Sequence, residues 1–158
     1  MASLTKYFFD KGREFGFSPG MLRSFFEVGE KAYAYPTRLQ IEPSSACNLH
    51  CVMCPIDEMV RPKGIISFEN FKKIVDKAPT AKALSLTGIG EPTMNRALPE
   101  MVAYAKARGM TVGFASNGTL FTQELAEKLV QAGLDHLSFS IDGGSKEAYE
   151  KIRRGGKF

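Results

Sequence analysis

The sequence alternates strand patterns with helix patterns four times between residues 37 and 158, and this alternation constrains the fold more than any other feature. Three of the four helices that follow the strands begin at capping hydroxyl residues (Ser67, Thr122 and Ser145), and two of the four end at Gly109 and Gly133. Strands separated by helices predict a parallel α/β sheet with right-handed crossovers. The predicted strands cover residues 38–42, 83–87, 111–115 and 136–141.

Side chains within each predicted strand alternate between apolar and polar. Parallel strands covered on both faces usually read as nearly continuous apolar runs, so this alternation is unusual. We expect helices to cover the apolar face and the small, polar face to line a cavity. An antiparallel sheet with one solvated face is the alternative that the pattern leaves open. The expected apolar face holds Leu39, Ile41, Leu84, Leu86, Val112, Phe114, Leu137, Phe139 and Ile141.

Composition places the chain among ordinary globular proteins. Its 158 residues are 44% hydrophobic and 24% charged, which suits one domain with a core of its own. A net charge of +4, spread among acidic residues, gives no support for nucleic-acid binding. The sequence contains no apolar run long enough to span a membrane and no signal-peptide core, so we expect a reducing, cytoplasmic location.

Residues 1–36 form a predicted N-terminal helical extension ahead of the core domain of residues 37–158. Ser18-Pro19 is a helix start signal, and the residues that follow place Leu22, Phe25 and Phe26 on one stripe. We expect this stripe to pack on the main domain. Because it is rich in phenylalanine, docking on a membrane surface or on a partner is the alternative.

All three cysteines lie in the loop after the first predicted strand, at Cys47, Cys51 and Cys54. An odd number of thiols cannot all form disulfides within the chain, and their close spacing is typical of a metal site. Three thiolates can hold three irons of a cubane cluster and leave the fourth iron open to another ligand. The alternative is a structural zinc ion bound by the three cysteines and His50.

The loops after the next three strands carry Gly90-Glu91, Ser116-Asn117 and Asp142. Because the carboxyl ends of parallel strands meet at one edge of a sheet, we expect these residues to converge with the cysteine loop. The competing interpretations are a solvated surface acid for Glu91 and ordinary turn residues for Asn117 and Asp142.

The ordered set of motifs resembles the radical S-adenosylmethionine (radical SAM) superfamily. Cys-x-x-x-Cys-x-x-Cys is similar to its cysteine signature, and the segment 87–92 is similar to its glycine–glycine–glutamate motif, with Ile89 in place of one glycine. The segments 116–118 and 138–143 are similar to its third- and fourth-strand motifs. The segment 149–156 resembles the branch that includes molybdenum-cofactor-biosynthesis and SPASM-type enzymes. Met53 stands where the family often has an aromatic residue.

The resemblance implies a cofactor role for each of these positions. Cys47, Cys51 and Cys54 would bind a [4Fe–4S] cluster whose fourth iron binds SAM. The other implied contacts are Gly90 and Glu91 to the SAM amino group, Ser116 and Asn117 near SAM, Ser140 and Asp142 to the ribose, and Arg153 or Arg154 to the SAM carboxylate. A solvated position at a helix end is the alternative for either arginine.

The resemblance also implies a partial parallel (β/α) barrel, of which the sequence shows about four of six units, so we expect the chain to be truncated at its C-terminus. The implied activity is reductive cleavage of SAM to a 5′-deoxyadenosyl radical that takes hydrogen from a substrate. The implied partners are a flavodoxin- or ferredoxin-like electron donor and a peptide or small-molecule substrate. No residue is assigned a catalytic role toward that substrate.

Overall fold

The computed structural model describes residues 10, 11, 13, 16 and 35–158. The helix predicted after Ser18 lies outside these residues, and the boundary between residues 36 and 37 stays a prediction. Four strands form one sheet in the order β1-β2-β3-β4, and all three pairings are parallel. The parallel α/β prediction is therefore confirmed and the antiparallel alternative is wrong. The strands are β1 (Arg38–Gln40), β2 (Ala83–Ser85), β3 (Thr111–Ser116) and β4 (His136–Phe139).

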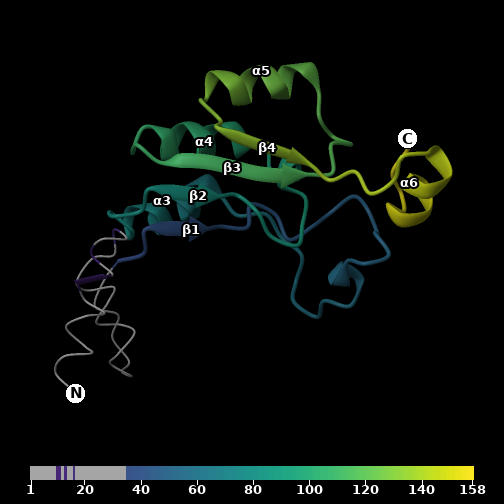
Figure 1. Ribbon diagram of the computed structural model, residues 1–158, viewed down its shortest axis with the longest axis horizontal. Helices are drawn as coiled ribbons and strands as arrows, with labels where there is room; N and C mark the ends of the chain where they lie inside the picture. Colours follow the sequence, from purple (N-terminus) through teal and green to yellow (C-terminus); the bar gives the residue numbers. More distant parts are fainter. Residues whose placement is uncertain (1–9, 12, 14–15, 17–34) are drawn as a thin grey trace.

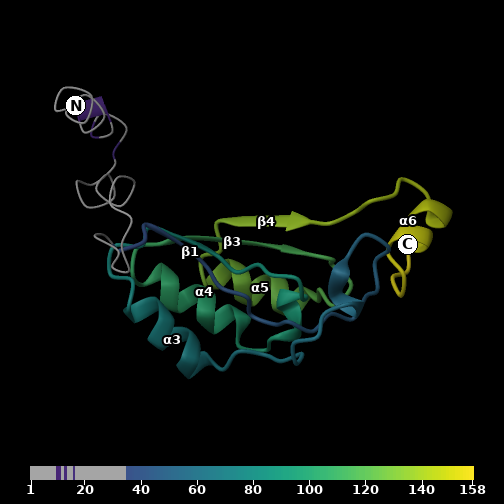
Figure 2. The same ribbon diagram turned by 90° about the horizontal axis from the view of Figure 1, so that it is seen from below.

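Helices cover one face of this sheet, as Figure 2 shows. A further helix lies beyond the carboxyl ends of the strands, where the last part of the chain meets the cysteine loop (Figure 1). The covering helices are α3 (Phe68–Asp76), α4 (Leu98–Lys106) and α5 (Gln123–Gln131), and the remaining elements are α6 (Lys146–Ile152), η1 (Pro55–Asp57) and η2 (Pro92–Met94).

The helix boundaries follow the predicted signals. Ser67, Thr122 and Ser145 each accept a hydrogen bond from the backbone N–H three residues further on, so all three predicted N-caps are confirmed. Gly109 and Gly133 have φ angles of 72° and 83° after α4 and α5. A left-handed residue here ends a helix at little steric cost only if it is glycine.

The core lies between the sheet and its three helices. Phe71 of α3, Leu98 and Met101 of α4, and Val112 of β3 are completely buried. These side chains hold the helices against the apolar face of the sheet, as the alternating pattern predicted.

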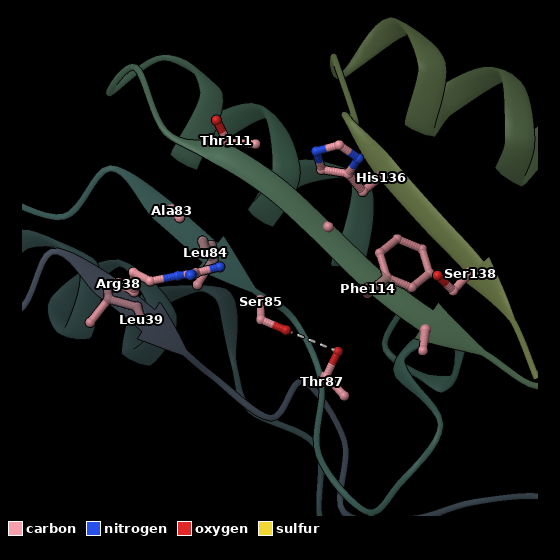
Figure 3. Close-up of a pocket in the computed structure, with 12 residues that line it drawn as sticks. Arg38, Leu39, Ala83, Leu84, Ser85, Thr87, Thr111, Phe114, His136 and Ser138 are labelled. Carbon is pink, nitrogen blue, oxygen red and sulfur yellow. Dashed lines mark hydrogen bonds between the residues drawn. The ribbon is translucent and has the colours of Figure 1, made fainter. Parts of the chain in front are cut away.

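The opposite face of the sheet carries a cavity of about 400 Å³. Figure 3 shows Ser85, Thr111, His136 and Ser138 on this face, with a hydrogen bond between the hydroxyls of Ser85 and Thr87. The prediction of a small, polar face that lines a cavity is confirmed. The described residues form a partial parallel (β/α) barrel of four units, whose polar face is the inner one.

Three strands are shorter than predicted. Backbone hydrogen bonds still join Ile41 to Ser85 and Leu86 to Gly113, but the chain then turns into the loops. β4 ends at Phe139, and Phe139 and Ile141 are 50% and 66% exposed rather than packed on the apolar face. β4 pairs only with β3 in the described sheet, so its second edge has no neighbour to bury these side chains.

Candidate active site

The loops at the carboxyl ends of all four strands enclose a cavity of about 460 Å³. Cavities of this size commonly bind small molecules. The structure brings all ten predicted site residues to its wall, although they come from loops far apart in the sequence. They are Cys47, Cys51, Cys54, Gly90, Glu91, Ser116, Asn117, Ser140, Asp142 and Arg153.

The cysteine loop is held in place by its backbone and by two buried side chains. Leu49 and Ile56 are 1% exposed and anchor the loop on either side of Cys51 and Cys54. The N–H groups of residues 50 and 52 donate to the carbonyls of residues 154 and 152 at the end of α6. The three thiols themselves are free and only partly buried. The sequence therefore folds here to present sulfur atoms at the cavity while apolar neighbours fix the loop.

Three N–H groups point at two of the sulfur atoms. The backbone N–H of Leu49 and the side-chain amide of Asn117 donate to Cys47 Sγ, at 3.4 and 3.7 Å. Arg153 Nη1 donates to Cys51 Sγ at 3.6 Å. Burial raises the pKa of the Cys47 thiol, and the Leu49 N–H partly offsets this. Donors of this kind stabilise the thiolate form, which is the form that binds metal.

His50 does not support the zinc alternative. Its Nδ1 lies 2.7 Å from a carboxylate oxygen of Asp57, and both side chains are more than half exposed. Within residues 35–158 and the few described before them, no group of three Cys, His, Asp or Glu side chains has the geometry to hold one metal ion. A cubane cluster makes no such demand, since each thiolate binds a different iron.

Glu91 faces protein groups rather than solvent. Its carboxylate is buried, and Oε1 accepts hydrogen bonds from the backbone N–H and hydroxyl of Thr93 and from the Ser116 hydroxyl. Oε2 accepts from the backbone N–H of Asn117 at 2.8 Å. The solvated-acid interpretation is therefore wrong for this residue. The expected contact between Glu91 and the SAM amino group stays a prediction, and these four donors show that the side chain also joins the loops after β2 and β3.

Gly90 allows that loop to lie directly on the cysteine loop. A Cβ atom at position 90 would overlap with the backbone carbonyls of Ser44 and Ala46. The Glu91 N–H donates to the Ala46 carbonyl at 2.8 Å in the same contact. Because the obstructing atoms are backbone, they cannot move aside as a flexible side chain would. Glycine is thus required here by close approach.

Asn117 links the loop after β3 to the cysteine loop. Its side-chain nitrogen donates to Asn48 Oδ1 at 3.0 Å, and Asn48 in turn donates to the Thr119 hydroxyl at 2.7 Å. The Thr119 hydroxyl and backbone N–H both donate to Asn117 Oδ1. Asn117 is therefore more than a turn residue. Asn48 and Thr119 belong to this network, and sequence reasoning missed both.

Asp142 and Arg153 form an ion pair at the wall of the cavity. Burial works to lower the pKa of Arg153, but Asp142 and the Cys51 sulfur raise this pKa above its usual value. Arg153 Nε is buried and, in the part of the chain that the structure describes, has no hydrogen-bond partner. Ser140 lines the same wall, whereas Arg154 is exposed. Of the two arginines considered, Arg153 is the one that reaches the cavity.

Comparison with known proteins identifies the class of this site. The family model of the radical SAM superfamily matches residues 41–158. The chain therefore belongs to the radical SAM superfamily, a family of enzymes whose cofactors are a [4Fe–4S] cluster and S-adenosylmethionine.

Two curated relatives are similar over most of the core. The tungsten-containing aldehyde ferredoxin oxidoreductase cofactor-modifying protein of Pyrococcus furiosus is 38% identical over 107 residues, which are 66% of this chain and 30% of that protein. Mycofactocin maturase MftC of Mycobacterium tuberculosis (strain CDC 1551 / Oshkosh) is 33% identical over 133 residues, 84% of this chain and 34% of that protein. The chain thus spans about a third of the length of these relatives.

Solved structures share the fold. BtrN in complex with AdoMet and 2-DOIA gives a TM-score of 0.61 at 20% identity, covering 73% of this chain and 50% of that one. Streptococcus suis SuiB bound to precursor peptide SuiA gives a TM-score of 0.65 at 15% identity, covering 95% of this chain and 40% of that one.

The residues present fit the cofactors of the family. Three unpaired thiols lie at one cavity, and two of them, Cys47 and Cys51, accept hydrogen bonds from N–H groups. The closely packed loop around Gly90 and Arg153, whose Nε is buried and has no partner among the described residues, line the same wall. Thiolates are the ligands that iron–sulfur clusters require, and polar groups around a cavity can fix a charged amino-acid moiety.

The described helices include none long and apolar enough to cross a bilayer.

Proposed function

We propose that this chain is the core of a radical SAM enzyme that cleaves S-adenosylmethionine reductively at the cavity of Cys47, Cys51 and Cys54. The observation that supports this most directly is the convergence of the three thiols with the loops after β2, β3 and β4 on one cavity. The bound cluster and SAM would together supply a 5′-deoxyadenosyl radical that takes hydrogen from a substrate.

The residues of the chain would bind and orient these groups. Cys47, Cys51 and Cys54 hold the cluster, with N–H donors on the sulfurs of the first two. The backbone around Gly90 and Glu91 offers acceptors to the SAM amino group, and Arg153 offers its free Nε to the SAM carboxylate. Ser116 and Asn117 would lie near SAM, and Ser140 and Asp142 would bind the ribose.

The substrate and the electron donor are proposed only as classes. A peptide substrate is supported by the likeness to mycofactocin maturase and to a SuiB structure that holds its precursor peptide. A small molecule is the alternative, supported by the likeness to BtrN bound to 2-DOIA. A flavodoxin- or ferredoxin-like donor would deliver the electron, and a cytoplasmic location stays a prediction.

Anaerobic reconstitution with iron and sulfide tests this function. We expect a brown protein with about four irons per chain, whose electron-paramagnetic-resonance spectrum in the reduced state changes on adding SAM. Cys51→Ala should lower the iron content and abolish the SAM-dependent change. His50→Ala is the matched control in the same loop and should leave both unchanged.

A zinc site of the three cysteines and His50 would give a different result in the same experiment. A colourless protein with one tightly bound zinc, which His50→Ala releases, would overturn the proposed function.

A further inference from the structure

We infer that Glu42 is a positioning residue, which holds the loop of residues 87–91 so that its backbone carbonyls face bound SAM. This inference rests on the proposed function and assigns a role to a residue outside the family motifs described above. Glu42 follows β1 and lies five residues before the first cysteine.

The carboxylate of Glu42 binds the backbone of the loop after β2. Its Oε1 accepts hydrogen bonds from the backbone N–H groups of Ile89 and Gly90, at 2.7 and 3.4 Å. A Cβ atom at Gly88 would overlap with the same carboxylate. Gly88, Ile89 and Gly90 line the cavity, whereas Glu42 is not among the described residues that line it.

This contact fixes the direction of two peptide groups. In a trans peptide the carbonyl points opposite to the N–H, and the described residues contain no cis peptide. With the N–H groups of Ile89 and Gly90 turned to Glu42, the carbonyls of Gly88 and Ile89 point away from it. In the arrangement that we infer, these carbonyls face the cavity that the loop lines. Carbonyl oxygens are suitable acceptors for the amino group of SAM.

A second contact fixes Glu42 itself. Arg61 Nη2 lies 2.6 Å from Oε2, and the Glu42 side chain is 20% exposed. Burial works to raise the pKa of Glu42, but the Ile89 N–H and the Arg61 guanidinium hold this pKa below its usual value. One carboxylate thus joins the end of β1, the segment around Arg61 and the loop of residues 87–91.

SAM affinity and cluster content of the reconstituted chain test the role of Glu42. Glu42→Ala frees the two N–H groups, so the binding-competent loop becomes a minor conformer and the apparent Kd for SAM rises, by about tenfold if one conformer in ten remains competent. Iron content should stay at the wild-type level. Glu42→Gln keeps one acceptor oxygen and should restore most of the affinity. Glu58→Ala, which removes an exposed carboxylate from the cysteine loop, is the matched control and should bind SAM as the wild type does.

A double-mutant cycle separates positioning from general damage. Gly88→Ala displaces the Glu42 carboxylate, so it should weaken SAM binding in the wild type but add little in the Glu42→Ala background. Equal effects of Gly88→Ala in both backgrounds would overturn the inference.

Two further outcomes would also overturn it. One is wild-type SAM affinity in Glu42→Ala, and the other is a parallel loss of iron and SAM binding, which would mean that Glu42 only holds the cysteine loop. If the wild-type chain carries a cluster but binds no SAM, the proposed function fails first and this inference fails with it.

Discussion

Replacing Glu91 by glutamine removes one charge from the centre of the site and changes only one atom. The carboxylate is 3% exposed, with three donors on Oε1 and one on Oε2. The amide will place its oxygen on the side of the three donors. Its NH₂ group then faces the backbone N–H of Asn117, which loses its acceptor.

The cost follows from these contacts. A hydrogen bond to a charged acceptor contributes about 1.5–3 kcal/mol, and a neutral acceptor about 0.5–1.5 kcal/mol. Loss of the Asn117 bond alone predicts that Glu91→Gln lowers the free energy of unfolding by about 1.5–3 kcal/mol, and weakening of the other three bonds adds to this. This is a large part of the roughly 5–15 kcal/mol that stabilises a typical domain.

Urea unfolding of the reduced chain without cofactors measures this change, and amide hydrogen exchange at Asn117 reports the lost bond directly. Glu124→Gln changes the same group at an exposed position of α5 and should leave the free energy of unfolding nearly unchanged. An unfolding free energy for Glu91→Gln within about 0.5 kcal/mol of the wild type, with unchanged exchange at Asn117, would refute the reasoning.

Further predictions concern the fold that carries the site. Phe71→Ala, at a completely buried position of α3, should lower the free energy of unfolding by about 3–5 kcal/mol in the same urea assay. Lys106 and the Val112 N–H hold the pKa of Asp135 below its usual value, so ionised Asp135 stabilises the fold above the ordinary aspartate pKa. Asp135→Asn should therefore lower the free energy of unfolding by a constant amount near neutral pH, and this loss should shrink as the pH falls through the lowered pKa of Asp135. A loss of stability that grows in acid would contradict this.

The topology was predictable because its signals are local. Ser67, Thr122 and Ser145 cap helices through atoms three residues away, and Gly109 ends a helix through its own φ angle. The alternation within strands needs only a period of two residues. Such patterns suffice for the order of elements and for the face that each strand buries.

The ends of the strands were not predictable in the same way. The pattern of residues 136–141 continues to alternate after β4 has ended, because the sequence does not state how many neighbours a strand has. Phe139 packs edge to face on Phe121, with ring centroids 5.2 Å apart, while half of its side chain stays exposed. Its environment depends on the edge of the sheet rather than on the local pattern.

The site itself was predicted by motif but not by contact. The sequence placed Glu91 and Asn117 beside the cysteines, but it predicted only a contact between Glu91 and SAM. It did not predict the hydrogen bonds of Glu91 to Ser116 and Asn117. Glu42 was missed because its partners Ile89 and Gly90 lie 47 and 48 residues further along the chain. A glutamate after a strand carries no local sign that it will accept backbone N–H groups from another loop.

These contacts give a physical reason why the motifs occur together and in this order. Gly90 packs on the backbone of the cysteine loop, and Glu91 binds the last residue of β3 and the residue after it. Asn117 contacts the cysteine loop through Asn48. Each loop is fixed by its neighbours in the sheet, so neighbouring parallel strands are needed to bring the motifs together. The motif residues therefore build the cavity before they bind anything in it, and a substitution at Glu91 should reduce stability even where no cofactor is present.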